Sequence, residues 1–213
     1  MSEPVAEIQN LSDSIGSFTE LVAAGTPTPG GGSVAAYCGV LAASLGQMMC
    51  NITIGKPKYA ASESRLKEIA DQLEQLSGRL RELIADDAAS FDAVLGAYRL
   101  PKETDDEKAK RGEQIQIAMQ GAVDVPFETA RRSFDVLKLL GELADIGTPS
   151  ALSDVAVGAQ LANVAIRGAS YNVNVNLGSL SDRDLGEKTR SEIDAIVHQG
   201  STIASEVSRK LKT

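Results

Sequence analysis

One carboxylate interrupts the apolar face of a long segment that the sequence predicts to be helical. Between Ser62 and Tyr98, apolar residues recur at alternating spacings of three and four, the period of an amphipathic helix. Asp86 and Asp92 fall at the edge of the apolar face or outside it. Asp87, by contrast, should lie in the middle of a buried face. The apolar side chains within roughly 60° of Asp87 around the helix axis are Leu66, Ile69, Leu73, Leu76, Leu80, Leu83, Ile84, Phe91, Val94 and Tyr98.

A carboxylate in such a position has two equally weighted interpretations. Burial of an aspartate raises its pKa because a low dielectric disfavours the charged form, and such a group can act as general acid or base near neutral pH. The alternative is a structural aspartate that a neighbouring helix satisfies, for instance through Arg167 or an asparagine, since an unpaired buried carboxylate is costly. The pattern leaves both interpretations open.

A glycine run offers a second candidate site. Gly30, Gly31, Gly32 and Ser33 follow a proline-containing turn and precede an apolar segment. Free backbone N–H groups at a helix start can bind an anion or a carbonyl oxygen, but the Lys-Ser/Thr ending of a P-loop is missing. A plain tight turn is the equally weighted alternative. Ser33 is expected to be the N-cap of the following helix.

Two further pairs of residues complete the candidates. Lys56 and Lys58 lie in a predicted loop and could bind a ligand carboxylate, although surface lysines are more commonly only solvated. Ser153 and Asp154 stand at the start of a charge-poor segment. They are expected to cap that helix and to complement its dipole, unless the site opens there.

Composition excludes several classes of function. Asp and Glu outnumber Lys and Arg by 29 to 21, giving a net charge of −8. This argues against nucleic-acid binding through bulk charge and against a basic membrane-binding surface. One histidine, His198, expected at the surface, and two cysteines are too few for a zinc site. Cys38 and Cys50 would lie roughly 18 Å apart in one helix, too far for a disulfide, which favours a reducing, cytoplasmic environment.

Two segments are too apolar to face water. No charge occurs between Glu20 and Lys56, and Val34–Thr53 has the length of a membrane span. Its alanines, glycines and polar residues favour a buried helix instead, because bulky hydrophobes are sparse. From Thr148 to Ser181 the only charges are Asp154 and Arg167, which predicts a second buried helix.

Boundary signals divide the rest of the chain. Gly25 is predicted to end a first helix, Thr104 with Glu107 forms a capping box, and Pro126 either kinks a helix or starts a new one. Ser150 or Ser153 is expected to cap the second apolar helix, and Ser181 or Asp182 the last helix. The alternation between Asn172 and Asn176 is interpreted as helix, because no other segment offers a strand to pair with it.

These signals predict one all-α domain over residues 1–213. We expect an up-and-down-like bundle of about six helices, two of them long, apolar and buried. A single layer of neighbours would leave those two helices partly exposed, so a homodimer is expected. No nucleic acid and no membrane is expected as a partner.

Several motifs together resemble the cyclodeaminase/cyclohydrolase family of folate enzymes, over nearly the whole chain. That family comprises the C-terminal domain of formiminotransferase-cyclodeaminase and standalone methenyltetrahydrofolate cyclohydrolases. In chain order, the matching motifs are Thr28-Pro29-Gly30-Gly31-Gly32-Ser33, Asn51-Ile52-Thr53-Ile54-Gly55-Lys56, Asp87 before Phe91, Leu100-Pro101-Lys102, Ser153-Asp154, and Asn172 with Asn176.

The resemblance implies an all-helical homodimer with a folate site at or near the subunit interface. It implies that Asp87 matches the catalytic aspartate, and it assigns Ser153, Asp154, Asn172 and Asn176 to substrate binding together with the glycine run and the two lysines. The implied substrate is a tetrahydrofolate derivative, with or without a polyglutamate tail, and no metal and no further cofactor are implied.

The implied reaction is hydrolysis of 5,10-methenyltetrahydrofolate to 10-formyltetrahydrofolate, because the chain has no room for a formiminotransferase domain. Formiminotetrahydrofolate cyclodeaminase, releasing ammonia, is the second expectation, and a non-catalytic folate-binding helical dimer is the alternative of another class. Two departures stand out. Val155 and Ala156 replace smaller residues and are expected to narrow the pocket, and Pro57 replaces a lysine that could contact a polyglutamate tail.

Overall fold

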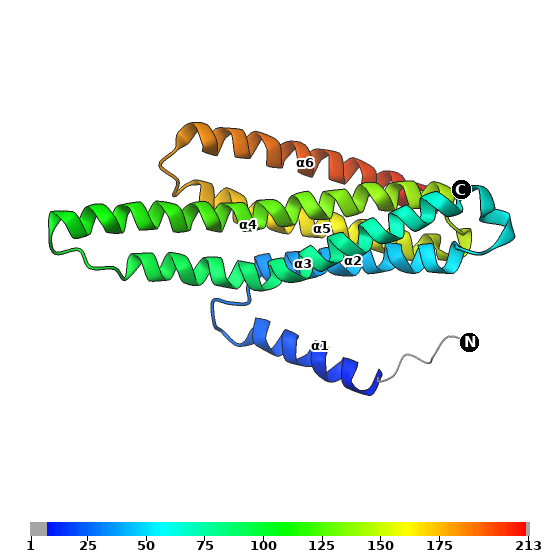
Figure 1. Cartoon of the computed structure of the whole chain (residues 1–213), viewed down its shortest axis with the longest axis horizontal. Coiled ribbons are helices and arrows are strands. Elements are labelled where there is room, and N and C mark those ends of the chain that lie inside the picture. The colour runs from blue at the N-terminus through cyan, green and yellow to red at the C-terminus, as the bar shows by residue number, and fades with distance from the viewer. Residues whose placement is uncertain (1–7, 212–213) are drawn as a thin grey trace.

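The part of the chain that the structure describes folds into six α-helices and two short 3₁₀ segments (Figure 1). The computed structural model describes residues 8–211, with side chains from residue 15 onward, and this part contains no strand. The prediction of an all-α fold with about six helices is therefore confirmed. The elements are α1 (Ile8–Ala23), α2 (Gly31–Thr53), η1 (Pro57–Ser62), α3 (Glu63–Tyr98), α4 (Asp105–Ile146), η2 (Pro149–Ala151), α5 (Leu152–Leu177) and α6 (Arg183–Lys210).

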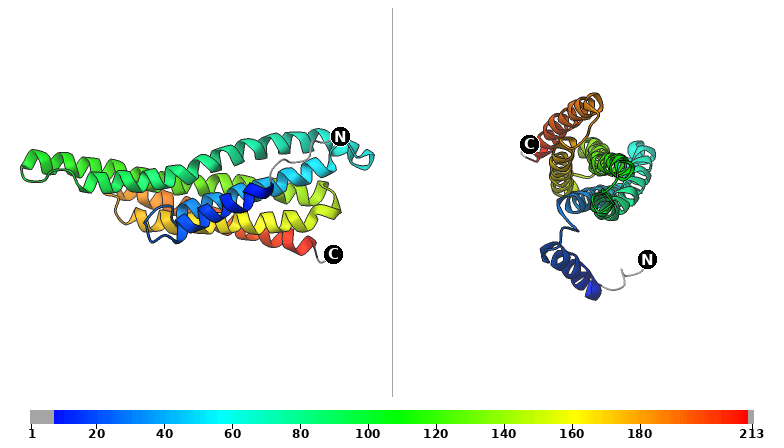
Figure 2. Two further views of the ribbon diagram at one scale, coloured as in Figure 1. Left: turned by 90° about the horizontal axis from the view of Figure 1, so that it is seen from below. Right: turned by 90° about the vertical axis from the view of Figure 1, so that its left-hand side faces the viewer.

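Helices α2 to α6 form an elongated bundle in which α4 contacts each of the other four helices (Figure 2). Helix α2 contacts α3, α4 and α5, while α6 covers α4 and α5. By length and hydropathy, α2 could span a membrane, but it is a core helix of the bundle. Its interior face is built from alanine and glycine, and a Cβ added at Gly46 would lie 2.7 Å from Leu73 Cδ1. The small residues thus let the neighbouring helices approach closely.

Helix α1 lies apart from the bundle (Figures 1 and 2). Its side chains Ile15, Leu21 and Val22 are exposed, and it touches the bundle through Phe18, whose ring centroid is 5.3 Å from that of Tyr37. Gly25, just beyond its end, has a φ of +74°, as expected of a helix-terminating glycine. The predicted helix is present, but its apolar stripe does not join the core.

Two predicted N-caps are wrong. Helix α2 begins at Gly31 with Gly30 as its N-cap, which places Ser33 in the first turn rather than at the cap. Helix α5 follows Ala151 without any side-chain cap, so neither Ser150 nor Ser153 caps it. Before α5 the chain passes through η2, whose last residue, Ala151, takes the cap position.

Other predicted boundaries are confirmed. The Thr104 side chain and Glu107 form the capping box of α4, and the Asp182 carboxylate accepts from Leu185 N at 3.0 Å to cap α6. At Pro126, where a kink or a new helix is expected, α4 continues as one helix, so no new helix starts there. The alternating asparagine segment is helical, within α5.

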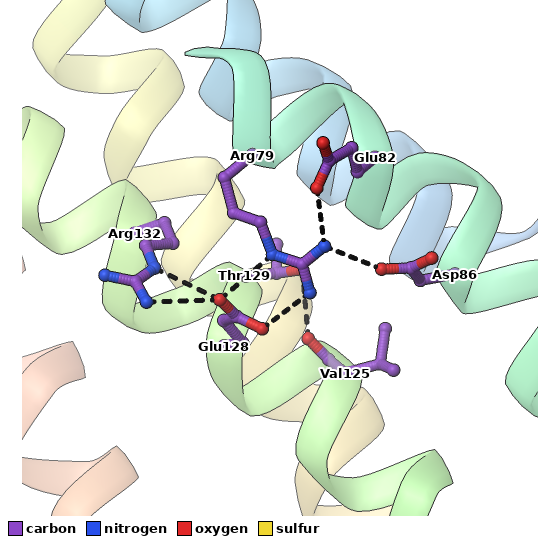
Figure 3. Close-up of polar contacts among 7 residues, drawn as sticks. All are labelled: Arg79, Glu82, Asp86, Val125, Glu128, Thr129 and Arg132. Atoms are coloured by element: carbon purple, nitrogen blue, oxygen red, sulfur yellow. Dashed lines mark hydrogen bonds and ion pairs between the residues drawn. The ribbon is translucent and has the colours of Figure 1, made fainter. Parts of the chain in front are cut away.

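Two arginines join α3 to α4 about four helical turns apart. Arg65 binds both carboxylate oxygens of Glu142 at 2.7 Å, and Arg79 binds both oxygens of Glu128 at 3.1 and 2.8 Å. Arg79 also reaches Asp86 on its own helix at 3.0 Å (Figure 3). Bidentate pairs of this kind fix geometry as well as charge, so they hold the two longest helices in register.

Candidate active site

A cleft of about 300 Å³ opens where α2 begins. Helix α2 starts at Gly31, level with Asp87 in the middle of α3, while α3 and α4 continue beyond it. The cleft therefore lies between the end of α2 and the extended helices beside it. It is lined by Pro27, Thr28, Gly30, Gly31, Gly32, Asp87, Ser90, Phe91, Val94, Met119, Ala122, Asn172 and Asn176.

Ser33 binds one oxygen of the Asp87 carboxylate. Its backbone N–H donates to Oδ2 at 2.8 Å, and its hydroxyl lies 2.9 Å from the same oxygen. The hydroxyl also lies 3.0 Å from the carbonyl oxygen of Ile84. The first amides of a helix have no partner within it, so the carboxylate satisfies one of them and lies at the positive end of the α2 dipole.

The structure does not show the expected burial of Asp87. The residue is half-buried, and the apolar face is enclosed only up to Leu83. Beyond it, Phe91 and Tyr98 are exposed because α2 does not extend far enough to cover them. The proposed structural partner Arg167 is exposed on α5, and Ser33 takes that role instead.

Gly32 allows α2 to start against the carboxylate. A Cβ added there would lie 2.0 Å from Asp87 Oδ1, far inside any van der Waals contact. Within the described residues, Oδ1 accepts no hydrogen bond, in contrast to Oδ2. The arrangement therefore leaves Oδ1 beside Gly32 without a hydrogen-bond donor among the described residues, on a side chain that lines the cleft.

Two asparagines of α5 line the same cleft. Asn172 Nδ2 donates to the Gly168 carbonyl at 3.0 Å, and Asn176 Nδ2 donates to the Ala122 carbonyl of α4 at 2.6 Å. The structure thus brings together Asp87, the glycine run, Ser33 and both asparagines, which the sequence separates widely.

The other predicted site residues lie at the opposite end of the bundle. Lys56 and Lys58 follow the C-terminal end of α2, roughly 35 Å from its start, and both are exposed. Ser153 and Asp154 are near them, since the Thr148 amide preceding α5 donates to Thr53 Oγ1 at 3.2 Å. One chain therefore does not bring these four residues to the Asp87 cleft.

The expected effect of Val155 on the pocket is also absent from this cleft. Val155 is fully buried in the main core of the bundle, at the far end of α5 from the asparagines. Conversely, the cleft residues Phe91 and Val94 belong to the stripe that the sequence assigns to the core. They line the cleft because α2 begins beside Asp87 and does not cover them. The level along α3 at which α2 begins cannot be predicted from a local sequence pattern.

A larger groove, of about 570 Å³, lies between α3 and α4. Its arginines are already paired with carboxylates: Arg79 with Glu128, and Arg65 with Glu142. Arg79 and Arg65 lower the pKa of these two glutamates by hydrogen bonding to the charged form. The arginines of the groove are thus held in ion pairs (Figure 3). The candidate active site is the smaller cleft, which contains Asp87.

No group of three or more His, Cys, Asp or Glu side chains suitable for a metal ion occurs in the part of the chain that the structure describes. The side chains of the cleft that can exchange protons or donate hydrogen bonds are the Asp87 carboxyl group, the hydroxyls of Thr28 and Ser90, and two asparagine amides.

Comparison with known proteins identifies the fold and its relatives. Residues 14–195 match the family model described as formiminotransferase-cyclodeaminase. The chain belongs to the formiminotransferase-cyclodeaminase family. Among members, a methenyltetrahydrofolate cyclohydrolase of Methylorubrum extorquens is 38% identical over 202 residues, covering 95% of this chain and 97% of that protein.

Other formiminotransferase-cyclodeaminase relatives are longer. The rat formimidoyltransferase-cyclodeaminase is 35% identical over 198 residues, which are 92% of this chain but 37% of that protein. Among solved structures, the formiminotetrahydrofolate cyclodeaminase of Thermotoga maritima has a TM-score of 0.82 and 26% identity, covering 97% of this chain and 100% of that one. The resemblance inferred from the motifs is thereby confirmed.

Proposed function

We propose that the chain hydrolyses 5,10-methenyltetrahydrofolate to 10-formyltetrahydrofolate. The observation that carries this proposal is the Asp87 carboxylate, which Ser33 holds by one oxygen at the cleft while the other oxygen stays available. The Methylorubrum relative, named for this activity, matches the chain over nearly its whole length, which supports hydrolysis over the other folate reactions.

The reaction needs a base and a proton shuttle. The substrate carbon between N5 and N10 is cationic, so attack by water requires only that a proton be removed as the C–O bond forms. Asp87 Oδ1 would accept that proton. The tetrahedral intermediate then collapses with cleavage of the C–N5 bond. N5 takes the proton back from Asp87, and the hydroxyl proton leaves to solvent as the formyl C=O forms, so one proton is released overall.

Formiminotetrahydrofolate cyclodeaminase activity is the second candidate. The Thermotoga structure with the same fold bears that name. In this reaction the same carboxylate would protonate departing ammonia rather than activate water. A non-catalytic folate-binding dimer remains the alternative of another class, and it predicts binding without turnover.

We further propose a homodimer that pairs α5 with α5 of a second copy. The exposed face of α5 carries Val157, Val164, Tyr171 and Val175, whose exposed fractions are 55, 54, 62 and 77%. Val157 and Tyr171 are each two turns from Val164, so the stripe is self-complementary when two copies run antiparallel about Val164. Isologous two-fold contacts have this property.

An antiparallel pair would also complete the site. The Ser153 end of one α5 would lie beside the Asn172 end of the other, so the lysine loop of one subunit would approach the Asp87 cleft of its partner. Lys56 and Lys58 would then be placed to bind the glutamate tail of a folate. The separation of the two residue groups within one chain supports this arrangement.

We also propose a cytoplasmic location. Cys38 and Cys50 are free, and burial raises the pKa of the Cys50 thiol to about 11, which keeps it protonated and unreactive. Free thiols are typical of proteins in reducing compartments.

One assay separates the candidate activities. Pure protein is added to 5,10-methenyltetrahydrofolate and the loss of its ultraviolet absorbance is followed against the spontaneous rate. Acceleration supports the cyclohydrolase, and its absence eliminates it. Release of ammonia from 5-formiminotetrahydrofolate would support the cyclodeaminase, and binding of either folate without turnover would support the binding dimer.

A further inference from the structure

A proline in α4 creates a hydrogen-bond acceptor that a cleft residue uses. In a regular helix the N–H of residue 126 would donate to the carbonyl of Ala122, but Pro126 has no N–H. Ala122 is buried, and a buried carbonyl without a donor is costly. Asn176 of α5 supplies the missing donor, with its Nδ2 at 2.6 Å from the Ala122 oxygen.

This contact fixes which way the Asn176 amide faces. A carbonyl oxygen only accepts hydrogen bonds, so the NH₂ group of the amide must face Ala122. The amide oxygen then points away from that contact, and within the described part of the chain no donor binds it. Asn176 and Ala122 both line the cleft that contains Asp87. What Asn176 offers a ligand there is therefore a hydrogen-bond acceptor.

We propose that Pro126 is a positioning residue that holds the Asn176 amide oxygen ready to accept from an N–H group of the pterin ring of the substrate. The inference rests on the proposed folate function, because a pterin edge carries ring N–H and amino donors. Asn172 shows the same orientation principle, since its NH₂ group is engaged by Gly168 within α5. Without the proline, the helix itself would occupy the Ala122 carbonyl and the Asn176 amide would be free to turn.

A double-mutant cycle on the unliganded protein tests the hydrogen bond. N176A leaves the Ala122 carbonyl unpaired and should lower the Tm by roughly 3–8 °C. In the P126A background residue 126 has a backbone N–H that can bind the Ala122 carbonyl. N176A should then lower the Tm by only about 1 °C or less. P126V, closer to proline in volume, serves as a second background. The cycle cancels the effect of the proline substitution itself.

Asn174 provides the matched control. It lies on the same helix, and its Oδ1 accepts from Arg190 at 2.9 Å on the exposed side. N174A should change the Tm equally in both backgrounds. If N176A lowers the Tm by the same amount with and without Pro126, the proposed hydrogen-bond relationship is overturned.

Ligand binding tests the positioning role. With 5-formyltetrahydrofolate as a stable probe, N176A should raise the Kd about tenfold, and P126A, which keeps Asn176, about threefold. N174A should leave the Kd unchanged. In turnover, N176A and P126A should both raise KM more than they lower kcat.

An unchanged Kd and KM in P126A would overturn the positioning role. If the wild-type protein binds the probe but does not hydrolyse 5,10-methenyltetrahydrofolate, the hydrolase proposal fails, while the Tm cycle and the Kd values still decide the role of Pro126. If the wild-type protein does not bind the probe, the pterin assignment is overturned and only the Tm cycle applies.

Discussion

Ser33 donates to Oδ2 of Asp87 through both its backbone amide and its hydroxyl, at 2.8 and 2.9 Å. The two residues are separated by 54 positions in the chain, so this contact joins the start of α2 to the middle of α3. It orients the carboxylate and leaves the second oxygen without a donor among the described residues. Support of a reactive group by a rigid helix start is what a preorganised site requires.

Asp87→Asn should preserve the fold and remove the activity. The amide can still accept from Ser33 through its oxygen, but it cannot take a proton from water. General-base catalysis contributes about 10²–10⁴-fold, so kcat should fall by about that factor while the circular dichroism spectrum stays unchanged. Asp92→Asn is the matched control, because Asp92 is exposed on the same helix and should keep full activity. Full activity in the Asp87 variant would end the catalytic interpretation.

Gly32→Ala should displace the carboxylate. The added Cβ would meet Asp87 Oδ1 at 2.0 Å, so α2 or α3 must shift, and the Ser33 contacts must lengthen. We expect a loss of about 2 kcal/mol in the free energy of unfolding and a fall in kcat of about tenfold or more. Urea denaturation and the absorbance assay measure the two effects.

Gly78→Ala is the control for this substitution. Gly78 lies on α3 with no atom within 4 Å of an added Cβ, and alanine has the higher helix propensity, by about 1 kcal/mol. This variant should be slightly more stable and equally active. Wild-type kcat in the Gly32 variant would contradict the geometry described for Asp87.

The secondary structure was largely predictable, because it depends on local signals. The apolar period between Ser62 and Tyr98, the Thr104 capping box and the Asp182 cap all depend on residues within a few turns of one another. Asp87 could be found because it breaks a period. Its role stays a prediction that the Asp87→Asn variant tests.

The details of the site were not predictable, because they depend on tertiary register. A serine before an apolar run is a good N-cap candidate, yet Gly30 takes the cap since Ser33 is engaged by a carboxylate of another helix. The level at which α2 starts along α3 also decides that Phe91 lines a cleft rather than a core. Neither relationship can be predicted from the spacing of residues within one segment.

Val164→Glu should convert a dimer to a monomer. In the antiparallel pairing of α5 proposed above, Val164 meets its own copy at the two-fold axis, so two buried carboxylates would face each other without partners. Sedimentation equilibrium should give twice the chain mass of 22.4 kDa for the wild type and the single mass for the variant. Activity should fall about tenfold or more, because the partner's lysine loop is lost.

His198→Glu is the control for the added charge. His198 is exposed on α6, away from the α5 stripe, and this variant should stay dimeric and active. A dimeric Val164→Glu variant, or a monomeric wild type, would overturn the proposed interface.

Arg79→Gln should lower the free energy of unfolding at neutral pH but not in acid. Arg79 lowers the pKa of Glu128 by hydrogen bonding to the charged carboxylate. A carboxyl with a lowered folded-state pKa contributes stability above its unfolded pKa, about 4.3 for Glu, and that contribution is lost as the pH falls through the folded value. In urea denaturation, the free energy of unfolding of the variant should therefore be about 1 kcal/mol below that of the wild type at pH 7. This difference should shrink below about pH 4.

Arg99→Gln is the matched control, because Arg99 is exposed on the surface and forms no ion pair within the described residues. Its free energy of unfolding should differ from that of the wild type by an amount that does not change with pH. A difference for Arg79→Gln that stays constant from pH 7 to pH 3 would show that Glu128 is not the group through which Arg79 stabilises the α3–α4 contact.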